Sequence, residues 1–405
     1  MGHTCRVLPE SSDQVLEFTG PAGRAELERA IGLAESVTET DPVRRAAAVR
    51  RLLPPELATA ALTQARLRAA ARTKFGDLAA TMLFTADGLE QATRIEVADH
   101  RAARFAAAGL GSVLDLCCGI GSDALAFARA GLRVEGVERD PATAALAAAN
   151  TAGQPVRISL GSAEQAGWRH AESVFLDPAR RGAHGRTFDP AAYSPSFEFV
   201  LRVLDGERPA AAKLGPGIGH ALIPRDLEAE WVSFGGGVKE AVLWSAGFTT
   251  AGIRRRATVL PAGLRLSDAD PAEPRVGPVG SYLYEPDGAV IRAGLVRQLA
   301  ALLPGGRRIG EQLAYLSADA PADGPAAGLA RGFEVLDVLP YSLKRLRAEL
   351  ARRQVGVVEI KKRGVDIDPA VLRRELKPAG PNSITVLLAR VGEKHLAILA
   401  EPVTR

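Results

Sequence analysis

The chain has 405 residues, of which 47% are hydrophobic and 24% are charged, and its formal net charge is +4. No apolar run is long enough to cross a bilayer, and three cysteines and six histidines show no disulfide or metal-ligand spacing. These features exclude an integral membrane protein and a disulfide-rich domain. They predict a cytoplasmic protein without a metal or a membrane partner, with roughly two to four domains.

The first 95 residues carry apolar positions at helical spacing. Pro54-Pro55 marks a helix start, and residues 57–72 are rich in helix formers. We therefore predict a helical N-terminal subdomain over residues 1–95, followed by an α/β domain over residues 96–266.

Residues 115–123, with the sequence Asp-Leu-Cys-Cys-Gly-Ile-Gly-Ser-Asp, lie between an apolar run and a segment with helix character. A strand, a glycine turn and a helix let the backbone approach a ligand closely and direct helix N–H groups toward it. A second predicted strand, Leu132–Glu138, ends in a carboxylate 23 positions after Asp115. That is about the separation at which an acidic residue meets a ribose hydroxyl, so the pattern predicts a nucleoside cofactor.

The identity of that cofactor depends on the residues around the turn. Residues 119–124 also fit the G-x-G-x-x-A dinucleotide fingerprint. However, Asp115 would repel a pyrophosphate and attract a cationic ligand such as the methionine part of S-adenosylmethionine. A third apolar strand, from Ser173, ends in Asp177-Pro178.

Together these three ordered elements resemble the class I S-adenosylmethionine-dependent methyltransferases, over about residues 113–181. The family has an acidic residue with a glycine turn, a ribose-binding acid after the second strand, and an Asp/Asn-Pro element after the fourth. The resemblance implies that S-adenosylmethionine is bound by Asp115, Cys117, Gly119, Gly121 and Glu138. Cys117 replaces the family's first glycine. Ser162 stands where an aspartate is common, and its hydroxyl can accept a hydrogen bond from the adenine amine.

The predicted catalytic residues are Asp177, Pro178 and Arg180. In amino-methylating relatives, an Asn/Asp-Pro-Pro-aromatic element binds the target amine and stacks its base. Here Asp177 can orient an exocyclic amine, and Arg180 can stack on a base or hold a phosphate. The alternative for Arg180 is a structural ion pair with an acid of the N-terminal helices, such as Glu90. A uracil-C5 methyltransferase mechanism is excluded because it needs a cysteine nucleophile, and no cysteine follows Cys118.

Further basic residues surround the predicted acceptor site. Arg181 and Arg186 follow Asp177, and Lys213 lies in a predicted fifth strand over residues 210–214. Since ligands bind at the carboxyl ends of the strands in open α/β sheets, these cations favour a polyanionic substrate.

Later segments predict strands over residues 241–244 and 257–260, and then a linker rich in Asp, Pro and Gly over residues 267–280. Residues 280–332 follow as a small α+β (ferredoxin-like) module, with a strand at 282–284 and a helix at 291–303.

The last 65 residues contain 14 Lys/Arg and 7 Asp/Glu, so the basic excess of the chain is concentrated there. Their pattern predicts an α-β-α-β-β order that ends in a hairpin around Gly392, and it resembles a THUMP-like domain over residues 333–405. THUMP domains bind RNA, commonly tRNA, so the resemblance implies that Lys361, Lys362 and Arg363 contact RNA.

The sequence therefore predicts an α/β protein with a Rossmann-like methyltransferase core, a helical N-terminal subdomain and small C-terminal α+β modules. The expected function is N-methylation of a base in tRNA or rRNA. Two alternatives remain open: a small-molecule or protein methyltransferase, and an RNA-binding protein that holds the cofactor without turnover.

Overall fold

The computed structural model describes residues 16–182, 185–186 and 193–403, and for residues 180–182 and 185–186 it describes the backbone only. The described residues form two compact units. The first contains residues 16–214 and 243–249, and the second contains residues 215–242 and 250–403. Within the described residues, no helix is long and apolar enough to cross a membrane.

The first unit begins with helices, as the sequence predicts. Pro at the first position starts several of them, because a helix loses no hydrogen bond there and the fixed φ of proline suits the helix. The small apolar core between these helices includes Leu27, Ile31 and Ala58 and extends to Leu146. The helices are α2 (Pro21–Ser36), α3 (Pro42–Leu52), α4 (Pro55–Phe75), α5 (Ala86–Gln91) and α6 (Ile95–Ala107), with a 3-10 turn at Gly76–Ala80.

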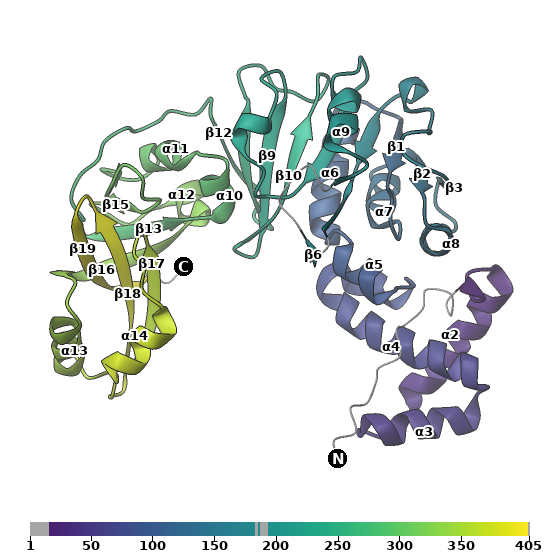
Figure 1. Ribbon diagram of the computed structural model, residues 1–405, viewed down its shortest axis with the longest axis horizontal. Coiled ribbons are helices and arrows are strands. Elements are labelled where there is room, and N and C mark those ends of the chain that lie inside the picture. Colours follow the sequence, from purple (N-terminus) through teal and green to yellow (C-terminus); the bar gives the residue numbers. More distant parts are fainter. Residues whose placement is uncertain (1–15, 183–184, 187–192, 404–405) are drawn as a thin grey trace. The chain divides into compact units, whose positions relative to one another are not determined.

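A Rossmann-like sheet follows in the chain, with strands from both units, and it confirms the predicted fold class (Figure 1). Its strands and helices are β1 (Ser112–Leu116), α7 (Ser122–Arg129), β2 (Arg133–Glu138), α8 (Pro141–Asn150), β3 (Val156–Leu160), β4 (Val174–Leu176), α9 (Phe197–Leu204), β8 (Ala210–Leu214), β9 (Glu228–Phe234), β10 (Gly237–Trp244), β11 (Arg255–Leu260) and β12 (Leu264–Ser267). The strand order is β12-β11-β9-β10-β8-β4-β1-β2-β3. A short three-stranded sheet of β5 (Ala179–Gly182), β6 (Gly185–Arg186) and β7 (Tyr193–Ser194) lies between β4 and α9 in the chain.

The order of the parallel strands determines where a ligand can bind. From β1 the chain moves outward through β2 to β3 and then returns to β4 on the other side of β1, so the direction of winding reverses between β1 and β4. In register, Leu116 of β1 is opposite Leu176 of β4. Ligands in open α/β sheets bind beyond the carboxyl ends of strands at such a switch point. Asp115 and Asp177 are therefore brought to the same edge.

The second unit contains a seven-stranded sheet in the order β14-β15-β13-β16-β19-β18-β17. Its elements are β13 (Tyr282–Pro286), α10 (Gly288–Arg292), α11 (Val296–Ala301), β14 (Arg307–Arg308), β15 (Leu316–Ala318), α12 (Gly324–Leu329), β16 (Ala330–Pro340), α13 (Leu343–Arg352), β17 (Val355–Arg363), α14 (Pro369–Leu376), β18 (Asn382–Val391) and β19 (Lys394–Pro402). The α-β-α-β-β order predicted for the C-terminus is present from α13 to β19. The helix predicted over residues 291–303 is instead two short helices, because Gly294 has φ of 70° between them.

The C-terminal sheet does not separate at the predicted domain boundary. Residues 332 and 333 lie inside β16, which pairs with β13 on one side and with β19 on the other. On one face, Leu346 of α13 and Leu372 of α14 pack against Ile384, Val386 and neighbouring apolar residues of the sheet.

Gln64 of α4 makes a stability prediction possible for the first unit. Its side chain is fully buried; its amide donates to the Phe84 carbonyl (2.7 Å) and accepts from the Phe84 N–H (3.0 Å). Gln64→Leu keeps most of the volume but leaves two buried backbone groups unpaired. We expect a loss of about 2–4 kcal/mol in the free energy of unfolding, measured by urea denaturation.

Gln154→Leu is the matched control, because the Gln154 side chain is exposed in the turn before β3. It should change stability by less than about 0.5 kcal/mol. Equal losses in both variants would show that the Gln64 amide does not stabilise the segment around Phe84.

Candidate cofactor and acceptor site

The turn between β1 and α7 has three residues in the left-handed region. The φ angles are 65° at Cys117, 56° at Gly119 and 84° at Gly121. An added Cβ at Gly121 would lie 3.1 Å from the Thr151 side chain, so this glycine permits close packing against the end of α8. An added Cβ at Gly119 would point into open space. The turn thus leaves room for a ligand beside Gly119. At Gly121, by contrast, a side chain would be crowded by the protein's own packing.

Asp115 is the most unusual group of the site. Its carboxylate is fully buried, and neither oxygen has a hydrogen-bond partner among the described residues. Burial, and then the carboxylates of Asp123 and Asp177, raise the pKa of Asp115 well above its usual value, while Arg101 and Lys213 partly oppose this. A buried carboxylate without a partner is costly unless a donor arrives. A cationic ammonium would supply that donor.

Glu138 closes the other side of the turn. From the end of β2, its Oε2 accepts a hydrogen bond from the Gly119 N–H (3.1 Å), and its Oε1 accepts from the N–H groups of Arg139 (2.9 Å) and Asp140 (3.0 Å). A carboxylate has about four acceptor positions, so Glu138 can still bind a ribose hydroxyl. The backbone contacts also hold the side chain in place before any ligand binds.

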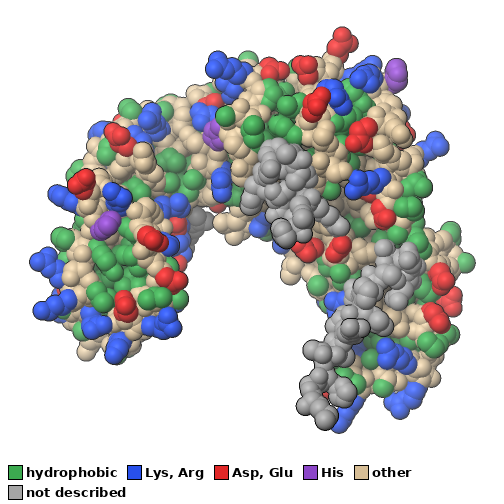
Figure 2. All heavy atoms as spheres, in the orientation of Figure 1, with side chains coloured by type: hydrophobic (Ala, Val, Ile, Leu, Met, Phe, Trp, Pro, Cys, Tyr) green, Lys and Arg blue, Asp and Glu red, His purple; other side chains and the backbone are tan. Residues whose placement is uncertain are grey.

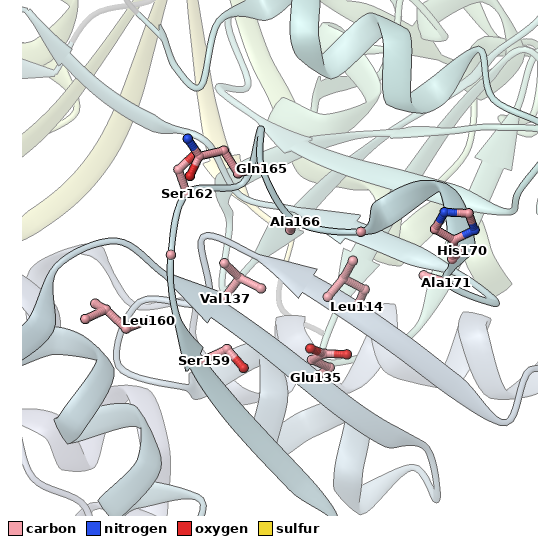
Figure 3. Close-up of a pocket in the computed structure, with 12 residues that line it drawn as sticks. Leu114, Glu135, Val137, Ser159, Leu160, Ser162, Gln165, Ala166, His170 and Ala171 are labelled. Atoms are coloured by element: carbon pink, nitrogen blue, oxygen red, sulfur yellow. The ribbon is translucent and has the colours of Figure 1, made fainter.

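Ser162 lies after β3, at the edge of a hollow of about 440 Å³ (Figure 3). Its hydroxyl donates to Glu164 (2.9 Å). The segment that joins β3 to β4 contains one three-residue 3-10 helix, Trp168–His170, and contributes His170 to the lining of the hollow. Among the predicted cofactor residues, only Ser162 lines this hollow.

On the acceptor side, Asp177 follows β4 and forms an ion pair with Lys213 of β8. About a quarter of the Asp177 side chain, 26%, remains exposed, whereas that of Lys213 is 9% exposed. Lys213 also donates to the Thr93 hydroxyl (2.8 Å), and Thr93 donates to Asp123 (2.9 Å). Lys213 is therefore held inside the protein at the base of the site.

The chain of contacts continues into the N-terminal helices. Asp123, in the first turn of α7, forms an ion pair with Arg101 of α6, whose side chain is 1% exposed. The Arg101 guanidinium also lies 4.5 Å from the centre of the Phe175 ring. Three carboxylates and two cations thus share one buried region at the switch point of the sheet.

Comparisons with known proteins agree with this geometry. A THUMP domain-like family matches residues 330–402, and a domain of unknown function matches residues 11–71. An uncharacterized S-adenosylmethionine-dependent methyltransferase of Mycobacterium tuberculosis (strain CDC 1551) is 38% identical over 349 residues, covering 84% of this chain and 94% of the relative. The same values hold for the protein of strain H37Rv.

The chain belongs to the S-adenosylmethionine-dependent methyltransferases and carries a C-terminal THUMP-like domain. A crystal structure of a putative methyltransferase from Porphyromonas gingivalis W83 has the same fold, with a TM-score of 0.75 and 22% sequence identity. The likeness covers 94% of this chain and 99% of that chain. The predicted family, fold class and cofactor are thereby confirmed.

The residues of this methyltransferase fit its cofactor. S-adenosylmethionine carries an ammonium group, a ribose and an adenine. The unpaired Asp115 carboxylate, the free acceptor capacity of Glu138 and the open space at Gly119 suit the first two. When bound, the cofactor supplies an electrophilic methyl group.

Other predicted residues of the methyltransferase lie near Asp177 in the chain. Pro178 follows it directly, Arg180 and Arg181 are in β5, and Arg186 is in β6. The side chains of these three arginines lie outside the described residues. Both interpretations of Arg180, a substrate contact and a structural ion pair, therefore stay predictions.

The predicted RNA-contacting residues are in β17 of the second unit. Lys361 donates to Glu285 (2.6 Å), and Arg363 binds the same carboxylate (3.3 Å). Lys362 alternates with them along the strand and is exposed. Of the three, Lys362 is the one with most of its side chain available to a partner.

Sequence reasoning missed three residues of the site: Thr93, Arg101 and Asp123. Asp123 belongs to the glycine-turn segment, and its place in the first turn of a helix is a recognisable signal. Thr93 precedes an ordinary amphipathic helix, and Arg101 lies within it. Only tertiary contacts distinguish these two residues from their neighbours.

Cys117 provides a test of the turn geometry. A side chain in the left-handed region costs about 1–2 kcal/mol, and glycine avoids most of that cost. We expect Cys117→Gly to raise the free energy of unfolding by about 0.5–1 kcal/mol, measured by urea denaturation without cofactor. Cys117→Ala keeps the strained backbone and should give no such gain. A lower free energy of unfolding in Cys117→Gly than in the wild type would show that the backbone at this residue is not strained.

The raised pKa of Asp115 predicts that cofactor binding depends on pH. This pKa is raised in the free protein, and an arriving cation favours the ionised form, so binding should release a proton below that raised pKa. Affinity for S-adenosylmethionine should therefore increase as pH rises toward the raised pKa. Calorimetry in two buffers with different ionisation enthalpies measures the released protons. Asp115→Asn should bind more weakly, and the same proton release in this variant would disprove the assignment.

Proposed function

We propose that this methyltransferase transfers a methyl group to a base nitrogen of structured RNA, either tRNA or rRNA. One observation carries the proposal: a partly exposed carboxylate, Asp177, stands at the end of β4 next to the β1 end that contains Asp115 and the glycine turn. A hydrogen-bond acceptor is thus placed beside the cofactor-binding edge, where an amine can be oriented.

The proposed reaction needs little from the protein beyond orientation. Asp177 accepts a hydrogen bond from an N–H of the target amine and directs the nitrogen lone pair toward the methyl carbon. The nitrogen–carbon bond forms as the carbon–sulfur bond breaks, with the electron pair of that bond remaining on sulfur. The amine proton passes to Asp177 or to water. Orientation of this kind contributes on the order of 7–11 kcal/mol in favourable cases.

Two features of the second unit support RNA as the substrate. The first is the match of residues 330–402 to the THUMP domain-like family. The second is a basic surface on α13 and α14, where Lys and Arg side chains gather in Figure 2. Arg352 of this surface pairs with Glu349, whereas the exposed Lys344, Arg345 and the adjoining Lys377 form no ion pair with any described residue. Unpaired surface cations are the groups that neutralise phosphates and release counterions.

The test is transfer of a radiolabelled methyl group from S-adenosylmethionine to total RNA of cells that lack the protein. Label should enter RNA, and Asp177→Ala should reduce its rate by about 100-fold or more, because the acceptor loses its hydrogen-bonding partner. Asp205→Ala, at an exposed position after α9, is the control and should keep full activity. The rate of methyl transfer to RNA should also fall steeply as the salt concentration rises.

Two results would contradict this function. Label that enters a protein or small-molecule fraction with little salt dependence would identify another acceptor. Binding of S-adenosylmethionine without transfer to any fraction would indicate an RNA-binding protein that holds the cofactor without turnover.

A further inference from the structure

Lys213 has a different environment from the one its sequence position suggests. A lysine at the end of a strand, close to the predicted acceptor site, is expected to extend toward substrate phosphates. In the structure its side chain is 9% exposed, and its ammonium is bound between the Thr93 hydroxyl and the Asp177 carboxylate. Two of the three ammonium hydrogens are thus used within the protein, and little of the side chain is accessible to a phosphate.

The donor and the acceptor of each hydrogen bond around Lys213 can be assigned. Thr93 donates its hydroxyl hydrogen to Asp123 (2.9 Å), so the oxygen of Thr93 is left to accept from Lys213 (2.8 Å). Asp123 is itself fixed by the buried guanidinium of Arg101. The position of the Lys213 ammonium is therefore set from the side away from Asp177. It cannot rotate freely to follow a mobile carboxylate.

Among the described side chains, Lys213 is the one that binds the Asp177 carboxylate. Lys213 binds its Oδ2, while 26% of the side chain remains exposed. Asp115 lies in the same buried region, and once ionised it would repel the Asp177 carboxylate if Lys213 were absent. Lys213 thus both fixes the orientation of Asp177 and compensates its charge.

We propose that Lys213 is a positioning residue for the methyl acceptor: it holds Asp177 in the orientation that receives the amine, and Thr93 holds Lys213. This inference rests on the proposed function, because it takes Asp177 as the group that orients the acceptor. It assigns to the N-terminal helices, through Thr93 and Arg101, a direct part in building the acceptor site.

The decisive experiment is steady-state kinetics of Lys213→Met with RNA at saturating S-adenosylmethionine. We expect kcat to fall roughly 100-fold, as for a misplaced catalytic group, with the KM for RNA and its salt dependence unchanged. Lys239→Met removes an exposed lysine of β10 and should match the wild type. An unchanged kcat would overturn the inference. A raised KM with a weaker salt dependence would overturn it too, since that result indicates a phosphate contact.

Two further variants separate positioning from a general loss of structure. Thr93→Val keeps Lys213 but removes the group that anchors it, so kcat should fall less than in Lys213→Met. In Lys213→Ala, added ethylammonium should restore part of kcat, because a small ammonium can occupy the place of the missing one. No restoration, together with a normal kcat in Thr93→Val, would count against the role of Lys213.

A measurement without RNA distinguishes failure of this inference from failure of the proposed function. Nitrogen-15 labelling of lysine ammonium groups reports proton exchange at Nζ. In the wild type, one slowly exchanging signal should disappear in Lys213→Met and exchange rapidly in Asp177→Ala. If the wild type methylates no RNA, the proposed function fails. This signal then still shows whether the Lys213 ammonium is bound to the Asp177 carboxylate. Rapid exchange in the wild type would show that Lys213 does not hold Asp177.

Discussion

The burial of charge at the junction of β1, β4 and α7 is the constraint on which the rest of this methyltransferase depends. Asp115 and Asp123 are almost without solvent contact, and both Asp123 and Asp177 act electrostatically on Asp115. Removing charges from water costs several kcal/mol per ion unless partners replace the water. Arg101 of α6 and Lys213 of β8 supply such partners to Asp123 and Asp177. The N-terminal helices, the glycine turn and the strand ends therefore form one site instead of three.

Within that site the acids have separate roles. Asp123 is fully used in holding Arg101 and Thr93, whereas Asp115 has no partner and Glu138 keeps acceptor capacity. The groups with free acceptor capacity are thus the ones predicted to bind the cofactor, and the satisfied ones hold the framework. Asp177 is intermediate, because one side binds Lys213 and the other side stays accessible.

The second unit shows why counting charges along the chain does not identify a binding surface. Lys361 and Arg363 stand in a basic run, yet both bind Glu285 from β13, 76 and 78 residues away. Exposed cations on or next to α13 and α14 that lack such partners, such as Lys344, Arg345 and Lys377, are the better candidates for phosphate contacts. The strand pairing of β13, β16, β19, β18 and β17 brings distant acids to some cations and leaves others exposed.

The sequence by itself determined the elements with local signals. The glycine turn, the acids that end β1 and β2, the Asp-Pro after β4, and the C-terminal α-β-α-β-β order all follow from short-range spacing, and they were sufficient for the family, fold class and cofactor. Only the tertiary structure decided which charges meet. Lys213 contacts Thr93 across 120 residues, and Arg101 contacts Asp123 from another helix. A lysine that holds a carboxylate and one that holds a phosphate look the same in sequence, because burial and partners arise only when distant segments pack together.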